Sequence, residues 1–74
     1  MNRKLYRLKS NKTTIVQRME NSNSQKIVWS RTMEEYGVDN SWMVSRFNPD
    51  NAIELTPEES KEVEDKIKKF KKRL

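Results

Sequence analysis

The sequence predicts an α+β fold, a small antiparallel sheet of three to four strands with a C-terminal α-helix packed on one face. Short runs rich in β-branched and aromatic residues, separated by Ser and Asn turns, fill residues 1–47. Residues 57–73 begin with helix-capping residues and continue with apolar residues at helical spacing. The length of 74 residues allows one domain, mainly a β meander over 1–47 and a helix over 57–73.

Three strands are expected in the first half of the chain. They cover residues 5–9, 13–19 and 26–33, with turn formers at 10–12 and 21–24 between them. Side chains of a strand alternate between its two faces, so Ile15 and Trp29 are expected in the core. The basic residues Arg7, Lys9 and Arg18 would then lie on the open face or at the edge of the sheet.

A short helix and a fourth strand are expected next. Thr32 and Glu35 form a capping-box pattern, and Gly37 is a natural helix stop. One helical turn therefore fits between Thr32 and Gly37. Residues 41–47 (SWMVSRF) predict a strand, and Pro49 favours a type I turn after it. The apolar residues of this run do not alternate cleanly, so either both faces are covered or some are exposed for a partner. The candidates for an exposed apolar patch are Trp42, Met43 and Phe47.

The C-terminal helix has a clear start. Thr56, Pro57 and Glu59 supply a cap, a proline at the first helical position and the residue that closes a capping box. Val63, Ile67, Phe70 and Leu74 then recur at spacings of 4, 3 and 4. This narrow stripe predicts docking on the chain's own sheet, and a self-associating helix is the open alternative.

The residue types that are missing exclude several reaction classes. The chain has no Cys and no His, so a zinc site, a thiol enzyme and a serine triad cannot be built. A single glycine cannot form a phosphate-binding loop. We therefore expect no enzymatic activity, no cofactor and no metal, and a protein that works by binding.

Positive charge is concentrated at the N-terminus. Six basic residues stand against Glu20 alone in residues 1–20, whereas the rest of the chain is balanced, and the net charge is +5. Basic residues of both ends are candidates for partner binding: Arg3, Lys4, Arg7, Lys9, Lys68, Lys69 and Lys72. They would attract an acidic partner protein or, as the alternative, nucleic acid without sequence preference.

Two features of the sequence resemble known proteins. Residues 25–29 (QKIVW) partly resemble the short peptide by which replication proteins dock on the bacterial sliding clamp, although Lys26 stands where leucine is expected. The small, Lys- and Asn-rich chain resembles phage host-takeover proteins, of which one kind blocks this clamp. The resemblance implies an inhibitor of a host DNA replication or transcription protein, with the sliding clamp or the polymerase machinery as partner.

Location and assembly follow from the same composition. No apolar run of signal-peptide or membrane-span length is present, so no membrane association is expected, and the protein is expected in the cytoplasm, which is the host cytoplasm for a phage protein. A chain this short has a thin core and usually gains stability from a partner chain. We therefore expect a homodimer or a subunit of a complex.

Overall fold

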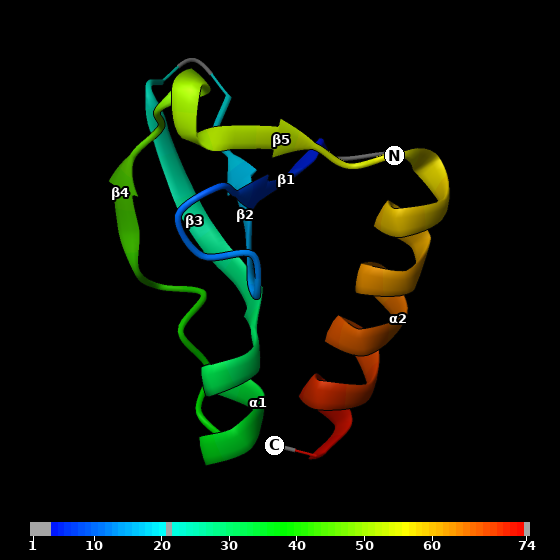
Figure 1. Cartoon of the computed structure of the whole chain (residues 1–74). Helices are drawn as coiled ribbons and strands as arrows, with labels where there is room; N and C mark the ends of the chain where they lie inside the picture. The colour runs from blue at the N-terminus through cyan, green and yellow to red at the C-terminus, as the bar shows by residue number, and fades with distance from the viewer. Residues whose placement is uncertain (1–3, 21, 74) are drawn as a thin grey trace.

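The computed structural model describes residues 4–20 and 22–73, and Figure 1 shows a curled sheet beside one long helix. The elements in chain order are β1 (Leu5–Leu8), β2 (Thr14–Arg18), β3 (Ser24–Ser30), α1 (Arg31–Tyr36), β4 (Val44–Arg46), the 3-10 helix η1 (Pro49–Asn51), β5 (Ala52–Glu54) and α2 (Pro57–Arg73). The predicted α+β class with an antiparallel sheet is confirmed. Within the described residues the sheet has five strands in the order β4-β3-β2-β1-β5, one more than the upper number expected.

The additional strand is β5, which pairs antiparallel with β1. Sequence reasoning missed it because it is only three residues long and contains one β-branched residue, Ile53. The turn before it is η1, which begins where the side chain of Asn48 accepts a hydrogen bond from the Asp50 N–H. After β5, the N–H of Leu55 donates to the carbonyl of Leu5 and extends the pairing toward α2.

The two edge strands, β4 and β5, are joined by only five residues, 47–51. This connection crosses from one edge of the sheet to the other, so the sheet is curled (Figure 1). Phe47 was expected in the exposed patch, but it is buried and 7% exposed. Its ring meets that of Tyr6 edge-on at 5.1 Å, and the guanidinium of Arg18 lies 5.0 Å from its centroid. The short connection between β4 and β5 places the Phe47 ring against the inner face of the curled sheet. The alternation of residues within one strand does not predict this position.

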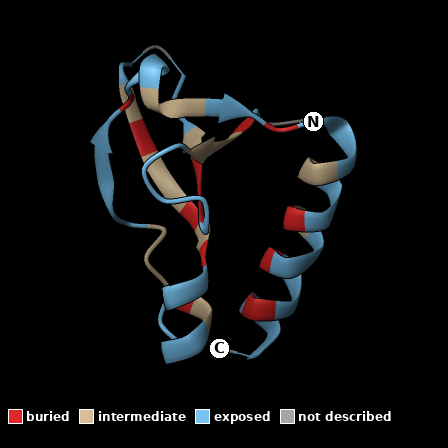
Figure 2. Cartoon of the chain, viewed as in Figure 1, coloured by how far each residue is buried: buried red, intermediate tan, exposed pale blue. Residues whose placement is uncertain are grey.

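The opposite face of the sheet is covered by α2. The core on this side is formed by Leu5, Ile15, Val28, Leu55, Val63 and Ile67, with the half-buried Trp29 packed against it. Figure 2 shows the buried residues of α2, Val63, Ile67 and Phe70, along the side of the helix that faces the sheet. The described part of the stripe therefore docks on the chain's own sheet, as predicted, while Leu74 lies outside the described residues. The alternative, a self-associating helix, would need the same apolar residues of α2, which the sheet already covers.

A β-bulge in β3 changes the expected alternation. Ile15 pairs with Trp29 and Val16 pairs with Ile27, which leaves Val28 without a partner opposite it on β2. Val28 belongs to the core under α2 and Trp29 packs against the same core. Strict alternation would have separated these two neighbours, and the bulge turns both toward α2.

The strand β3 also ends three residues earlier than expected, because Ser30 starts α1. Its side chain accepts a hydrogen bond from the N–H of Met33 at 3.0 Å, so the cap is Ser30 and the predicted cap at Thr32 is wrong. Gly37 ends α1 as predicted, with a left-handed φ of 67°. Met33 is thereby buried at the end of the sheet.

Candidate partner-binding surface

Exposed apolar side chains are concentrated between α1 and β4. We call this group the α1–β4 surface and define it as Tyr36, Val38, Trp42, Met43 and Val44. Trp42 is 74% exposed and Met43 is 44% exposed, as their lack of alternation suggested. Elsewhere in the described residues the exposed large apolar side chains are Met19 and Ile53. Several large apolar residues left exposed along one segment of the chain are candidates for a protein interface.

Local turns hold the backbone of the α1–β4 surface in place. The N–H of Val38 donates to the carbonyl of Met33, and the N–H of Met43 donates to that of Asn40 at 2.9 Å. Asp39 accepts a hydrogen bond from the Ser41 N–H at 2.8 Å. That bond, then the Ser41 side chain, and less strongly the charge of Lys71, lower the pKa of Asp39. The charged carboxylate is therefore the form that these bonds to Ser41 favour.

The surface continues onto the edge strand β4. All three residues of β4 are exposed, and the strand pairs only with β3 among the described strands. On one face of the pair, the side-chain amide of Gln25 donates to the hydroxyl of Ser45 at 3.1 Å. An edge strand beside exposed aromatic and aliphatic groups offers both backbone hydrogen bonds and apolar contact to a partner.

Two of the four predicted basic residues of the N-terminus, Lys4 and Arg7, form ion pairs with acids. Lys4 lies 3.7 Å from a carboxylate oxygen of Glu54, and Arg7 lies 3.4 Å from one of Glu59. Lys9 is exposed, and its backbone N–H bonds to the carbonyl of residue 51. Arg3 lies outside the described residues. The fold thus mixes N-terminal cations with acids of β5 and α2, so they do not form a purely basic strip.

A groove between the sheet and α2 brings the two basic ends of the chain together in part. Its volume is about 950 Å³, and Leu5 and Leu55 contribute apolar lining. The charged residues that line it are Lys4, Lys26, Lys61, Lys68, Glu54, Glu64 and Asp65. Of the predicted partner-binding residues, Lys4 and Lys68 therefore line the same groove. Lys69 and Lys72 are exposed and do not line it. Sequence reasoning missed Lys26 and Lys61, which share the groove only because β3 and α2 lie side by side.

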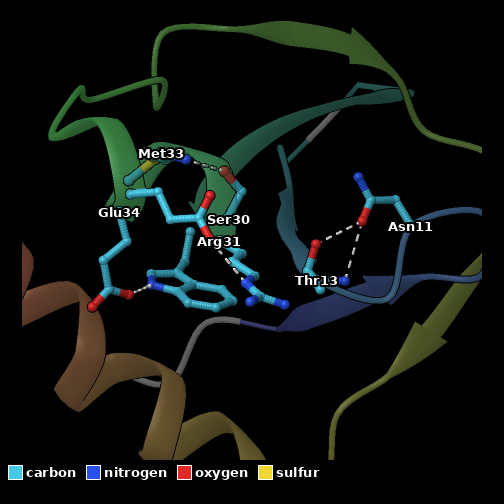
Figure 3. A network of polar contacts seen from close by, with 8 residues as sticks. Asn11, Thr13, Ser30, Arg31, Met33 and Glu34 are labelled. Carbon is cyan, nitrogen blue, oxygen red and sulfur yellow. Dashed lines mark hydrogen bonds and ion pairs between the residues drawn. The ribbon is translucent and has the colours of Figure 1, made fainter.

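The pentapeptide at 25–29 lies inside the sheet. Residues of β3 pair with β2 on one side and with β4 on the other. Gln25 is only 8% exposed, and Trp29 is held by a 2.8 Å hydrogen bond from its indole N–H to Glu34. Figure 3 shows the polar network around Ser30, Arg31 and Glu34 that fixes this end of β3. A docking peptide needs a free backbone, which these residues lack.

Other observations concern the whole described chain. Across residues 4–20 and 22–73, His, Cys, Asp and Glu form no group of three or more that could hold a metal ion. None of the described helices has the length and apolar character that a bilayer crossing requires. Comparison of the chain with protein families, with curated proteins and with solved structures found no match.

Proposed function

We propose that the chain is a small non-enzymatic binding protein that inhibits a host DNA replication or transcription protein, in the manner of phage host-takeover proteins, in the host cytoplasm. The observation that supports this proposal is the α1–β4 surface. Trp42 exposes most of its side chain at a place fixed by surrounding turns. Aromatic anchors of this kind supply most of the binding energy in many protein interfaces.

The distribution of charge favours a protein partner over nucleic acid. A protein that follows a phosphate backbone needs a continuous row of free cations. Here Lys4 and Arg7 are paired with acids, and the groove that contains Lys68 also contains three carboxylates. A surface of mixed charge beside an apolar patch suits a protein of complementary surface charge. Nucleic-acid binding without sequence preference remains the alternative function.

The sliding clamp is the first candidate target, and the structure changes how it would be bound. Because residues 25–29 are paired within the sheet, contact would be made by the α1–β4 surface. A protein that covers the clamp in this way blocks the replication proteins that use it. A homodimer also stays a prediction, and the oligomeric state at high concentration tests it.

The test combines a pull-down from bacterial lysate with a direct assay on purified sliding clamp. The bait is the full chain, the lysate is used with and without nuclease, and captured proteins are identified by mass spectrometry. Trp42→Ala is expected to abolish capture of a stoichiometric partner, while Met19→Ala, an exposed apolar residue elsewhere, preserves it. Purified clamp should bind the wild-type chain, and clamp-dependent primer extension by the polymerase should then fall.

Two outcomes would count against this function. Loss of every partner after nuclease, with tight binding to random DNA or RNA, would support the alternative function. Capture that is equal for the wild-type chain and for Trp42→Ala would remove the α1–β4 surface as the binding site. Failure of the clamp assay alone would exclude only that candidate.

A further inference from the structure

We propose that the open edge of β4 binds an extended acidic segment of the partner protein, which joins the sheet as a further antiparallel or parallel strand. This inference rests on the proposed function, because it states what kind of segment the partner presents. It is supported by the direction of backbone groups on β4, by the charges around them and by the exposed apolar residues next to them.

The backbone of β4 has a definite inner and outer side. The N–H of Phe47 donates to the carbonyl of Asn23 at 2.6 Å, and the N–H of Ile27 donates to the carbonyl of Met43 at 3.3 Å. Met43 and Phe47 therefore turn their backbone groups toward β3. In an antiparallel pair this direction alternates from residue to residue. The N–H and C=O groups of Val44 and Arg46 consequently point to the open edge, where an added strand can pair with them.

The charged residues of β3 and β4 themselves are basic, although Lys26 also lines the groove that contains Glu54, Glu64 and Asp65. Residues 40–49 contain no Asp or Glu, and neither does β3. Lys26 lies opposite Val44, and Arg46 lies opposite Ser24, so Lys26, Val44 and Arg46 share one face of the sheet. No ion pair of the described residues engages Lys26 or Arg46. An incoming strand with carboxylates at alternate positions would place them beside these two cations.

A charged, short edge strand can also serve to prevent aggregation. The neighbouring residues distinguish β4 from such a protected edge, because Trp42, Met43 and Val44 leave apolar side chains in solvent beside it. The other edge, β5, differs in charge: it carries Glu54, which pairs with Lys4. An acidic strand therefore meets cations beside β4, whereas at β5 it meets an acid that is already paired with a lysine.

A second copy of this chain fits the β4 edge less well. Pairing of β4 with β4 of another copy would bring two Arg46 and two Lys26 side chains to one short ribbon without an acid between them. Like charges across neighbouring strands destabilise the pairing. The acidic segment of another protein meets the same backbone groups with opposite charge, and self-pairing becomes one outcome of the test.

The probe is a blocked peptide of alternating Glu and Val, and a peptide of alternating Lys and Val is its control. Binding to the isotope-labelled full chain is followed by NMR, with amide hydrogen exchange measured residue by residue. The acidic peptide is expected to slow exchange at the N–H groups of Val44 and Arg46, which point outward. The N–H of Glu54 on the β5 edge serves as an internal control and should not change.

Two variants separate backbone pairing from charge. Val44→Pro removes an outward N–H that the fold does not use and should weaken peptide binding about tenfold, or about 1.4 kcal/mol. Val44→Thr keeps this N–H and the β-branched shape, so its affinity should match the wild type. Arg46→Glu should lose the acidic peptide and gain the basic one, which tests the charge even if Val44→Pro does not fold.

Several results would overturn this inference. One is peptide binding that leaves exchange at Val44 and Arg46 unchanged. Another is protection of these N–H groups that rises with protein concentration alone, which would assign the edge to a second copy. If Trp42→Ala abolishes partner capture while Val44→Pro and Arg46→Glu leave it intact, the proposed function stands and strand addition is wrong. If no variant affects capture, the proposed site itself is wrong.

Discussion

The indole N–H of Trp29 donates a hydrogen bond to Glu34 at 2.8 Å, and this contact joins the end of β3 to α1. The ammonium of Lys66 lies 4.7 Å from the centroid of the same ring and joins it to α2. Arg73, also on α2, forms an ion pair with Glu34 at 3.7 Å. One residue at the end of a strand therefore connects both helices to the sheet.

Replacing Trp29 with phenylalanine tests this connection. Trp29→Phe keeps a ring for packing and for Lys66 but removes the N–H, so the free energy of unfolding should fall by about 1 kcal/mol. Urea unfolding followed by circular dichroism measures the change. Trp42→Phe is the matched control and should stay within about 0.5 kcal/mol of the wild type. Equal stability of the two variants would show that the bond to Glu34 does not stabilise the fold.

Phe47 and Trp42 are expected to have opposite roles. Phe47→Ala removes a buried ring from beneath Tyr6 and Arg18, so it should lower the free energy of unfolding by about 3 kcal/mol. Trp42→Ala should change stability by no more than about 0.5 kcal/mol, because the side chain is mostly exposed. Thermal unfolding of the two variants compares them directly. A large loss of stability in Trp42→Ala would contradict its assignment to a free surface.

Gly37 allows a test of backbone conformation alone. Its φ of 67° lies in the left-handed region, and a Cβ added there would meet nothing within 4 Å. Gly37→Ala should therefore cost about 1 kcal/mol through backbone strain without any clash. Gly37→Asn should cost less, because Asn tolerates this conformation better. Chemical denaturation should rank the stabilities as Gly above Asn above Ala, and any other order would contradict the assigned cap.

The capping box at the start of α2 predicts a pH dependence. The hydrogen bond from the Thr56 N–H, then the Thr56 side chain and less strongly the charge of Arg7, hold the pKa of Glu59 below its ordinary value of 4.5. A pKa that is lower in the folded state means that ionised Glu59 stabilises the fold above pH 4.5. This stabilisation is lost as the pH falls below that value and through the folded-state pKa.

The corresponding experiment compares Glu59→Gln with the wild-type chain across this pH range. Glu59→Gln should be less stable at pH 7, and its urea midpoint should approach that of the wild type as the pH falls below 4.5 and through the folded-state pKa of Glu59. Glu58→Gln removes the same charge from the same helical turn without touching the capping box. A difference that persists unchanged at low pH, or that is equally large for Glu58→Gln, would exclude the capping box as the cause.

Local sequence signals located the helices and several strands. Thr56 and Glu59 exchange the hydrogen bonds of the predicted capping box, and α2 then buries Val63 and Ile67 as their spacing implied. These signals are reliable because the interactions that create them span only a few residues. The bulge at Val28 and the strand β5 depend on pairing with distant residues, and neither leaves a local pattern.

The candidate site was predictable in part for the same reason. Trp42 and Met43 were found because their run does not alternate, and the structure leaves both exposed. Phe47 in that same run is buried, because the chain crosses the sheet just after it. Tyr36 and Val38 were missed, although the helix stop at Gly37 between them could have indicated a solvated turn.

The position of α2 in the chain has a consequence for synthesis on the ribosome. The core side of the sheet is covered by Val63, Ile67 and Phe70, all of which are translated after every strand. At about 5 to 20 residues per second, the helix follows β5 with a delay of about one to three seconds. During that interval a nascent chain holds Leu5, Ile15 and Val28 without their cover. Nascent chains of this protein should therefore be substrates for chaperones that recognise apolar strands until the last helix emerges.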